Sequence, residues 1–239
     1  STAVSGNVQM TRGTFTSNAV EFIVTASGVR SETVMLGTNP SSVSISPDGN
    51  TAFVTNQGSG TVAVLNVSGG STELTDTVPV GTNSRLTEIM HSRDGSKVFV
   101  LNFGSPSQEG NTVFVIDPDT LLVDDTIIVG ARPTRMALNP DGSRLYVTCF
   151  GVDQIYVIDT NTLEVVDTFN TGLGPNGIAV SPTKNEIYSC NFFEDTVTVA
   201  NSVNNLPTNS IQVGQGPARC EISPDGKFVF VSNFLDNTI

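Results

Sequence analysis

The sequence has no tryptophan, one histidine, three cysteines, and only 11 basic residues against 23 acidic ones. The net charge of −12 repels nucleic acids and anionic membrane surfaces, so neither is an expected partner. No run of about 18 apolar residues occurs that could cross a bilayer as a helix, so membrane insertion is not expected. One histidine, and cysteines without a C-x-x-C spacing, offer few ligands for a zinc site.

The three cysteines, Cys149, Cys190 and Cys220, allow at most one internal disulfide. They lie in apolar runs, so we expect buried packing thiols. The acidity, the low lysine content and the many threonine, asparagine and serine residues favour an extracellular or cell-surface location. The sequence begins at Ser1 with neither methionine nor a basic leader, which is typical of a processed or excised segment.

What the sequence has in quantity is valine, threonine and turn residues, including 22 glycines and 12 prolines, and these are arranged in a repeat. Each unit contains an apolar alternation, an S/N-P-D-G turn or a variant of it, and further apolar runs such as "LYVTC", "IYVID" and "VDTFNTG". Glycines close the units at intervals of 42 to 49 residues, at Gly37, Gly81, Gly130, Gly172 and Gly214. Four short antiparallel strands per unit at this period predict a β-propeller blade.

These units resemble the YVTN-type β-propeller repeat of archaeal and bacterial surface-layer and secreted proteins. The matching pieces are "LYVTC", "AFVTN", "VFVSN", "VFVID" and "IYVID", and the resemblance covers most of residues 38–239. It implies the architecture more than the activity, because this fold serves many functions.

We therefore predict an all-β fold, a single β-propeller domain of five blades over residues 1–239. Complete four-stranded antiparallel blades are expected at 38–81, 82–130, 131–172 and 173–214. Residues 215–239 hold the inner strands of a fifth blade, and residues 20–37 match the outer strands of a blade. We expect these N-terminal strands to complete the C-terminal blade and close the ring, which leaves residues 1–19 as an extension or extra strand.

Basic residues gather in the segments that should cross one mouth of the central channel. These segments hold four of the 11 basic residues and only one acid. Guanidinium groups at a concave mouth predict binding of a carboxylate, a phosphate or a sulfated sugar. The predicted ligand-binding residues are Arg85, Glu88, Arg132, Arg135, Arg219 and Asn176. The alternative is that the arginines pair with acids on neighbouring loops, namely Asp153, Glu194, Asp195 and Asp236.

Two further features allow two interpretations each. Phe103, Phe150, Phe192 and Phe234 follow the second strand of four units, where an aromatic ring either stacks on a ligand or packs between adjacent blades. The segment 103–112 is five residues longer than its counterparts, and it either confers specificity or is a neutral insertion.

No catalytic residues, metal site or cofactor are predicted. His91 replaces an apolar residue of its strand, so we expect it to point between blades. Asp117, Asp119 and Asp159 lie in turns where local hydrogen bonds explain them without calcium. No nucleophile elbow, P-loop or dinucleotide-binding glycine pattern occurs.

The function favoured by these observations is a non-catalytic extracellular scaffold that binds a protein or glycan partner through one face. The alternative is a lactonase-like hydrolase with Arg135, Arg219 and Glu88 at the channel mouth, because related propellers hydrolyse sugar lactones. A propeller that docks an electron-transfer partner is a third possibility, but no haem-attachment motif supports it.

Overall fold

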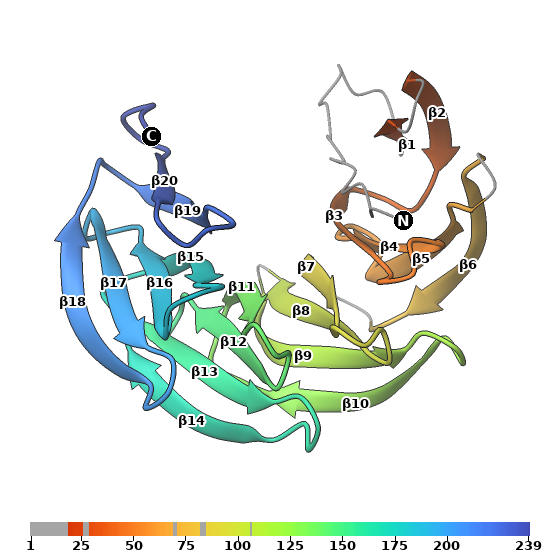
Figure 1. The fold of residues 1–239 in the computed structure, drawn as a ribbon. Helices are drawn as coiled ribbons and strands as arrows, with labels where there is room; N and C mark the ends of the chain where they lie inside the picture. The colour runs from red at the N-terminus through yellow and green to blue at the C-terminus, as the bar shows by residue number, and fades with distance from the viewer. Residues whose placement is uncertain (1–18, 26–28, 69–70, 82–84, 106) are drawn as a thin grey trace.

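The computed structural model describes residues 19–25, 29–68, 71–81, 85–105 and 107–239, with side chains from residue 33 onward. Strands within these ranges form six antiparallel sheets, four of them four-stranded and two of them two-stranded (Figure 1). This confirms the predicted all-β class built from four-stranded antiparallel blades. The segment expected as an extension, residues 1–19, lies outside the described residues except for Ala19.

The complete blades follow one another along the chain. The first comprises β3 (Pro40–Ile45), β4 (Thr51–Asn56), β5 (Thr61–Asn66) and β6 (Glu73–Pro79). The second comprises β7 (Leu86–His91), β8 (Val98–Ser105), β9 (Gln108–Asp117) and β10 (Leu122–Ile128). The third comprises β11 (Pro133–Leu138), β12 (Arg144–Cys149), β13 (Gln154–Asp159) and β14 (Val165–Asn170). The fourth comprises β15 (Pro175–Val180), β16 (Glu186–Asn191), β17 (Thr196–Asn201) and β18 (Leu206–Gln212).

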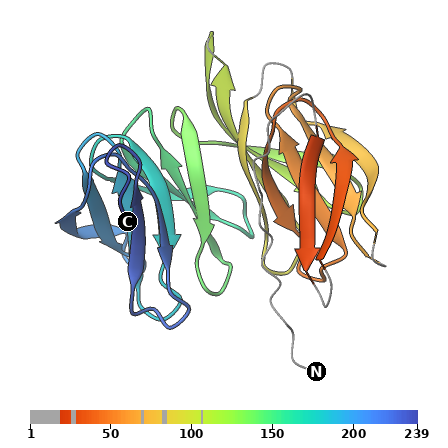
Figure 2. The same ribbon diagram turned by 90° about the horizontal axis from the view of Figure 1, so that it is seen from above.

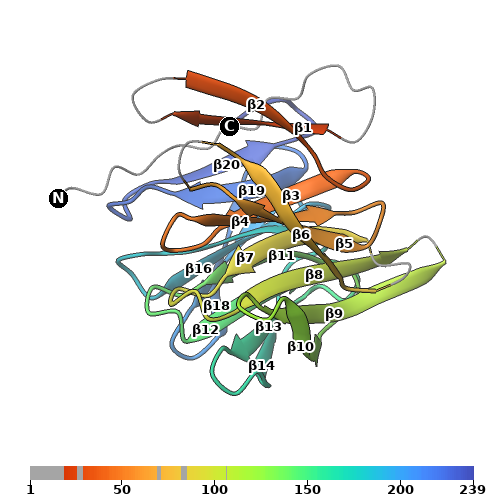
Figure 3. The same cartoon turned by 90° about the vertical axis from the view of Figure 1, so that its right-hand side faces the viewer.

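Each complete blade is a meander in which strands adjacent in sequence are hydrogen-bonded neighbours. The first strands of successive blades contact one another at the centre, whereas the fourth strands lie outermost, and every residue of β18 is exposed. The blades stack face to face in chain order (Figure 3). This arrangement puts the first strand of every blade on the wall of a central channel.

The apolar core is divided among the interfaces between blades. Phe53 of β4 packs with Val98 and Val100 of β8. In the same way, Phe99 of β8 packs with Leu145 of the next blade. The alternating apolar residues of the second strand in each complete blade therefore face neighbouring blades on both sides, which explains why β4 and β12 are almost wholly buried.

The asparagine of the repeat closes the second strand onto the third. Asn191 Nδ2 donates to Thr196 Oγ1 at 2.9 Å and to Thr198 Oγ1 at 2.8 Å. Asn56 and Asn233 make the corresponding bond with Thr61 and Thr238. In the third complete blade this position is Cys149, whose thiol instead donates to the Val147 carbonyl at 3.8 Å.

The four turns of the pattern S/N-x-D-G, in which x is proline or Arg93, have the predicted chemistry. Ser92 Oγ donates to Asp94 Oδ1 at 2.6 Å and accepts the Lys97 N–H at 2.9 Å, so the serine closes the turn. Hydrogen bonds from Ser92 and Ser96 lower the pKa of Asp94 to about 2. The glycine that follows the aspartate has φ between 69° and 78° in all four turns of this type, a region that favours glycine.

Hydroxyl groups on the first strands bind the backbone of the next blade. Ser41 Oγ donates to the Leu86 carbonyl at 2.8 Å, and Thr134 Oγ1 donates to the Pro175 carbonyl at 3.1 Å. Both hydroxyls lie at a β-bulge that interrupts the register between the first and second strands. These bonds join neighbouring blades close to the channel.

We expect Thr134→Val to lower the free energy of unfolding by about 1–3 kcal/mol, because it leaves the Pro175 carbonyl without this buried partner. Thr134→Ser keeps the hydroxyl and should cost less. Urea denaturation of both variants measures the difference. Equal stability of Thr134→Val and the wild type would show that this bond does not hold the blades together.

The two ends of the chain do not form the single closing blade that was expected. β1 (Ala19–Thr25) pairs with β2 (Val29–Met35), and β19 (Pro217–Ile222) pairs with β20 (Val229–Asn233), as two separate two-stranded sheets. Within the described ranges no strand pairing joins them, and they lie on opposite sides of an opening in the ring (Figure 1). Val34 and Leu36 pack on the first blade, whereas Cys220 and Val231 pack in the cluster that includes Ala179 of the fourth blade, so each two-stranded sheet is held by its own neighbouring blade.

Candidate functional site

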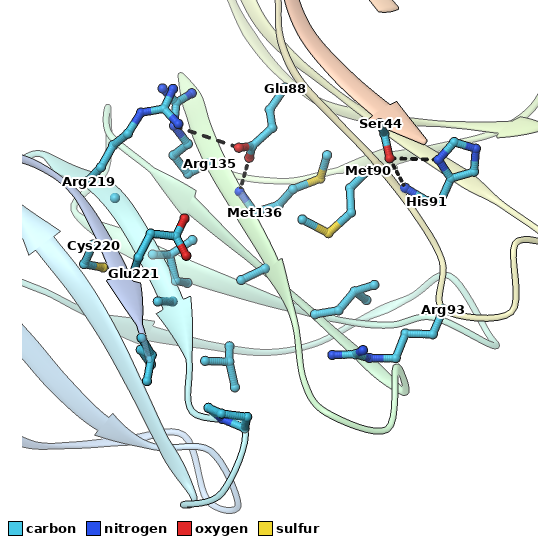
Figure 4. A pocket seen from close by; sticks show the side chains of 18 of the residues that line it. Ser44, Glu88, Met90, His91, Arg93, Arg135, Met136, Arg219, Cys220 and Glu221 are labelled. Carbon is cyan, nitrogen blue, oxygen red and sulfur yellow. Dashed lines mark hydrogen bonds and ion pairs between the residues drawn. The ribbon is translucent and has the colours of Figure 1, made fainter. Parts of the chain in front are cut away.

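The first strands enclose a cavity of about 730 Å³ in the central channel. β7, β11, β15 and β19 line most of it, and the Ser44 end of β3 completes the wall. The charged residues that line it are Glu88, Arg135 and Arg219 near the start of these strands, Glu221 farther along β19, and Arg93 just after β7 (Figure 4). The site therefore lies where the crossing segments enter the first strands.

The crossing segments and the turns after the second strands lie together at one face. The N–H groups of Phe103, Phe150 and Phe192 donate to the carbonyls of Arg85, Arg132 and Gly174 at 2.9–3.0 Å. The Phe234 N–H makes the equivalent bond to Gly216. Gln57 makes the equivalent bond to Asn39, so these backbone bonds place the residue after each second strand at the same mouth, whether it is phenylalanine or glutamine.

Arg85 and Arg132 lie away from the cavity. The Arg132 guanidinium pairs with Glu109 at 2.7 Å, and the Arg85 guanidinium lies 5.4 Å from the ring centroid of Phe103. Both partners belong to β8 and β9, so these arginines stabilise that hairpin. They do not converge with Arg135 and Arg219 on one ligand.

The segment 103–112, expected to be a long loop, is largely strand. β8 and β9 continue past the other blades, with Gly104 opposite Glu109 and Ser105 opposite Gln108. The hairpin extends beyond the neighbouring blades (Figure 2). The five extra residues therefore lengthen two paired strands instead of forming an open loop.

Glu88 and Arg135 form the centre of the site. Arg135 Nε lies 3.9 Å from Glu88 Oε1, and the Met136 N–H donates to Glu88 Oε2 at 2.5 Å. Their side chains are only 17% and 23% exposed, respectively. Arg135 Nη1 also donates to the Thr134 carbonyl, which fixes the guanidinium against β11.

The environment of Glu88 shifts its ionisation to neutral pH. Burial raises the pKa of Glu88 to about 7, against the opposing effects of Arg135, the Met136 N–H and Arg219, while Glu221 raises it further. Burial lowers the pKa of Arg135, and the Glu88 carboxylate raises it. A carboxyl group that ionises near pH 7 in a cavity is suited to proton transfer.

Gly177 allows β19, which carries Arg219 and Glu221, to pack closely against β15. A Cβ atom at Gly177 would lie 2.8 Å from Arg219 Cα, so the missing side chain lets β19 approach β15. Asn176, a predicted ligand residue, occupies the bulge position next to Gly177. It does not line the cavity, and its place in the repeat is that of Ser41 and Thr134, which bind the next blade.

The loop acids bind backbone N–H groups. Asp153 Oδ1 accepts the Gly174 N–H at 2.7 Å, and Asp195 Oδ1 accepts the Gly216 N–H at 2.8 Å. Asp236 accepts the Gln215 N–H in the same way. These acids cap the crossing segments, and the ion pairs of Arg132 and Arg135 are made with Glu109 and Glu88 instead.

His91 lies between blades, in agreement with the interpretation of its sequence position. Its ring packs edge-on against Phe53 of the preceding blade, with 5.1 Å between ring centroids. Ser44 Oγ lies 2.8 Å from Nδ1 and accepts the His91 backbone N–H at 3.0 Å. Burial lowers the pKa of His91 to about 4, so the ring is neutral at physiological pH.

Two of the recurring phenylalanines make contacts that the sequence left open. Phe150 and Phe193, from adjacent blades, have ring centroids 5.3 Å apart, and Phe192 packs edge-on against Phe193. Phe193 and Phe234 remain mostly exposed, together with Leu173 and Leu235. We call these four residues the apolar rim.

Glu221 and Ser44 were missed among the cavity-lining residues. The signal for Glu221 was strand alternation, since residues two apart on β19 face the same side and Arg219 was already placed at the channel.

Within the described residues no group of three or more His, Cys, Asp or Glu side chains is arranged to hold a metal ion. Asp117 and Asp159 accept N–H groups of their own turns, as predicted. The described residues also include no helix long and apolar enough to cross a membrane.

Comparison with known proteins supports the propeller fold. No curated protein matches the chain. A functionally unknown protein from Desulfotomaculum acetoxidans is 15% identical with a TM-score of 0.74, and the match covers 92% of this chain and 74% of that one. Kuenenia stuttgartiensis hydrazine synthase is 17% identical with a TM-score of 0.58, covering 92% of this chain and 88% of that one. At these identities both structures bear on the fold alone.

A match to a family supports more than the fold. The description "Lactonase, 7-bladed beta-propeller" matches residues 32–239, which include all four complete blades and the charged cluster of the channel. Because this match covers most of the sequence, the chain belongs to the seven-bladed β-propeller lactonase family.

Proposed function

We propose that the protein is a lactonase-like hydrolase that binds an anionic sugar lactone in its central channel. The observation that carries this proposal is the buried Glu88 carboxyl group, with a pKa of about 7, beside Arg135 in the cavity wall. A general base is most effective when its pKa lies near the working pH. The family match supports a lactone as the substrate class.

The proposed reaction uses the residues of the charged cluster. Glu88 takes a proton from a water molecule as that water attacks the lactone carbonyl carbon. A guanidinium group of Arg135 or Arg219 stabilises the negative charge on the carbonyl oxygen. As the ring C–O bond breaks, protonated Glu88 returns its proton to the leaving ring oxygen, which gives the hydroxy acid. The other guanidinium group binds an anionic substituent of the substrate.

Hydrolysis of a lactone panel tests the proposal. We expect lactones that carry a carboxylate or phosphate to be hydrolysed faster than glucono-δ-lactone, which is neutral, in a pH-stat assay with the uncatalysed rate subtracted. Absence of hydrolysis above the uncatalysed rate across the panel would reject the enzyme and favour the second candidate.

The second candidate is a non-catalytic extracellular or cell-surface scaffold of the YVTN type, which binds a protein or glycan through the face that bears the apolar rim. The exposure of Leu173, Phe193, Phe234 and Leu235 favours it, because exposed aromatic rings can stack on sugar rings or on a partner's side chains. Glycan-array binding that is lost in Phe193→Ala, together with a negative lactone panel, would support it.

The proposed hydrolase requires the channel arginines because its ligand is an anion. We expect the Arg135→Ala, Arg219→Ala double variant to weaken binding of glucarate by at least about 100-fold, because each charge-assisted contact contributes about 1.5–3 kcal/mol. Calorimetric titration at low salt measures this loss.

Arg132→Ala is the matched control, because Arg132 lies on the same crossing segment but pairs with Glu109 away from the cavity. It should bind glucarate like the wild type. Unchanged affinity in the double variant, or a comparable loss in Arg132→Ala, would contradict binding in the channel.

A further inference from the structure

Two of the three cysteines meet at the interface between the fourth blade and the β19–β20 sheet. Cys190 on β16 and Cys220 on β19 are both buried and share one cluster with Ala179 and Val197. Cys220 Sγ donates to the Tyr188 carbonyl at 3.5 Å, and Tyr188 lies two residues before Cys190 on the same strand. Both cysteines are free and buried, and Cys190 raises the pKa of Cys220, as expected for two thiols that are close neighbours.

The absence of a side chain at Gly177 leaves space for the two thiols. Gly177 lies opposite Cys190 in the β15–β16 pairing. A Cβ atom at Gly177 would lie 3.1 Å from Cys190 Sγ and 2.8 Å from Arg219 Cα, the residue before Cys220. The glycine therefore brings β19 against the Cys190 side chain, and both thiols occupy the same gap between blades.

The β19–β20 sheet has more to gain from a covalent link than any complete blade. It has two strands instead of four, and it packs against the fourth blade through one face only. Its other face leaves Phe228 and Phe230 more than half exposed. Fewer buried contacts make such an element the first to open by local unfolding.

We propose that Cys190 and Cys220 form an oxidative cross-linking site, at which a disulfide fastens the β19–β20 sheet to the fourth blade. The oxidant is a small-molecule disulfide such as oxidised glutathione. One cysteine thiolate attacks it, forming a mixed disulfide and releasing one glutathione thiol. The second cysteine thiolate then displaces the other glutathione, so two protein thiols become one disulfide and one oxidised glutathione becomes two reduced ones.

Burial makes this reaction dependent on opening of the interface. The neighbouring Cys190 thiol and burial raise the pKa of Cys220, so little thiolate exists while the sheets are packed. Oxidation is expected during refolding or when β19 separates transiently from β16. After closure, the disulfide holds the interface shut. This inference does not depend on the proposed hydrolase activity.

Cys149 provides an internal control. It is also buried, but it belongs to a different cluster that contains no other cysteine, and its thiol donates to the Val147 carbonyl of its own strand. Burial raises its pKa to about 12. If burial alone determined which cysteines are oxidised, all three would react alike. The proposed site predicts a disulfide between Cys190 and Cys220 only.

The test is to refold the full chain from guanidinium in a buffer of oxidised and reduced glutathione, and to alkylate the remaining thiols under denaturing conditions. Intact mass should show one alkylated cysteine, and peptide mapping should find Cys190 linked to Cys220. Cys149→Ser should form the same link and show no alkylation. The oxidised protein should melt about 5–10 °C above the reduced one, a shift that is absent in Cys220→Ser.

Several results would overturn the proposal. These are three alkylated cysteines after refolding, a lasting glutathione adduct without a bridge, or a bridge that includes Cys149. A disulfide that lowers the melting temperature would also contradict it, because the link would then distort the interface. Circular dichroism of Cys220→Ser establishes that this variant folds before its melting temperature is compared.

Discussion

Glu88→Gln is expected to lower kcat/KM for hydrolysis of an anionic lactone by about 10²–10⁴-fold, the usual contribution of a general base. Glutamine is close in size to glutamate, and its carbonyl oxygen can still accept the Met136 N–H, so the local structure should be kept. The loss would then report proton transfer and not unfolding. Steady-state kinetics at saturating and limiting substrate measure it.

The pH dependence of the wild type gives a second measure of the same group. A general base must be ionised, so kcat/KM should fall about tenfold for each pH unit below about 7 and level off above it. Glu221→Gln removes a negative charge that raises the pKa of Glu88, so it should move this midpoint to lower pH. A midpoint near pH 4.5 in the wild type would show that the general base has the pKa of an ordinary exposed glutamate, which contradicts a base buried as Glu88 is.

Glu109→Gln serves as the control for loss of a carboxylate elsewhere, because Glu109 pairs with Arg132 on the β8–β9 hairpin. It should hydrolyse the lactone at the wild-type rate. If Glu88→Gln retains the wild-type rate as well, the hydrolytic mechanism is wrong even if the channel binds anions.

The largest effect on stability is expected from Phe99→Ala. Phe99 is 0% exposed in the core between the second and third blades, and loss of a buried phenylalanine costs about 3–5 kcal/mol. Phe230 occupies the same position of the repeat, since Phe99 pairs with Met90 and Phe230 pairs with Glu221 in equivalent registers. Phe230 is 55% exposed, so Phe230→Ala should cost less than about 1 kcal/mol.

Urea denaturation of the two variants measures the loss in free energy of unfolding. It compares the same residue type at the same repeat position, once covered by a neighbouring blade (Phe99) and once not (Phe230). The comparison also examines how the ring ends. If Phe230→Ala costs as much as Phe99→Ala, the outer face of the β19–β20 sheet is covered in solution, as a closed ring would require.

The open arrangement of the ends has a geometric reason in the family. In a seven-bladed ring each blade turns the chain by one seventh of a circle, so four complete blades flanked by two separate two-stranded sheets occupy fewer than seven positions and leave the ring open. The expectation of closure came from matching strand lengths at residues 20–37 and 215–239. Strand lengths do not determine the angle between blades, because that angle depends on the side chains packed between them.

The candidate site was predictable in part. Arg135, Arg219 and Glu88 were placed at the channel because they align at the start of the first strand of each unit. Arg85 and Arg132 were predicted as ligand residues because they lie on the crossing segments, yet they contact Phe103 and Glu109 of a hairpin that extends by strand pairing. Sequence position places a residue on a segment, but its partner depends on which distant segment folds beside it.

The sequence by itself determined the repeating four-stranded sheets and the S/N-x-D-G turns, because these depend on local backbone preferences and on hydrogen bonds within one repeat. Only the tertiary structure decided that Glu88 is buried beside Arg135, that Gly177 admits β19, and that Cys190 meets Cys220. Each of these depends on the distance between blades more than 25 residues apart in the chain, and that distance is set by the packing of whole sheets, which no short stretch of sequence specifies.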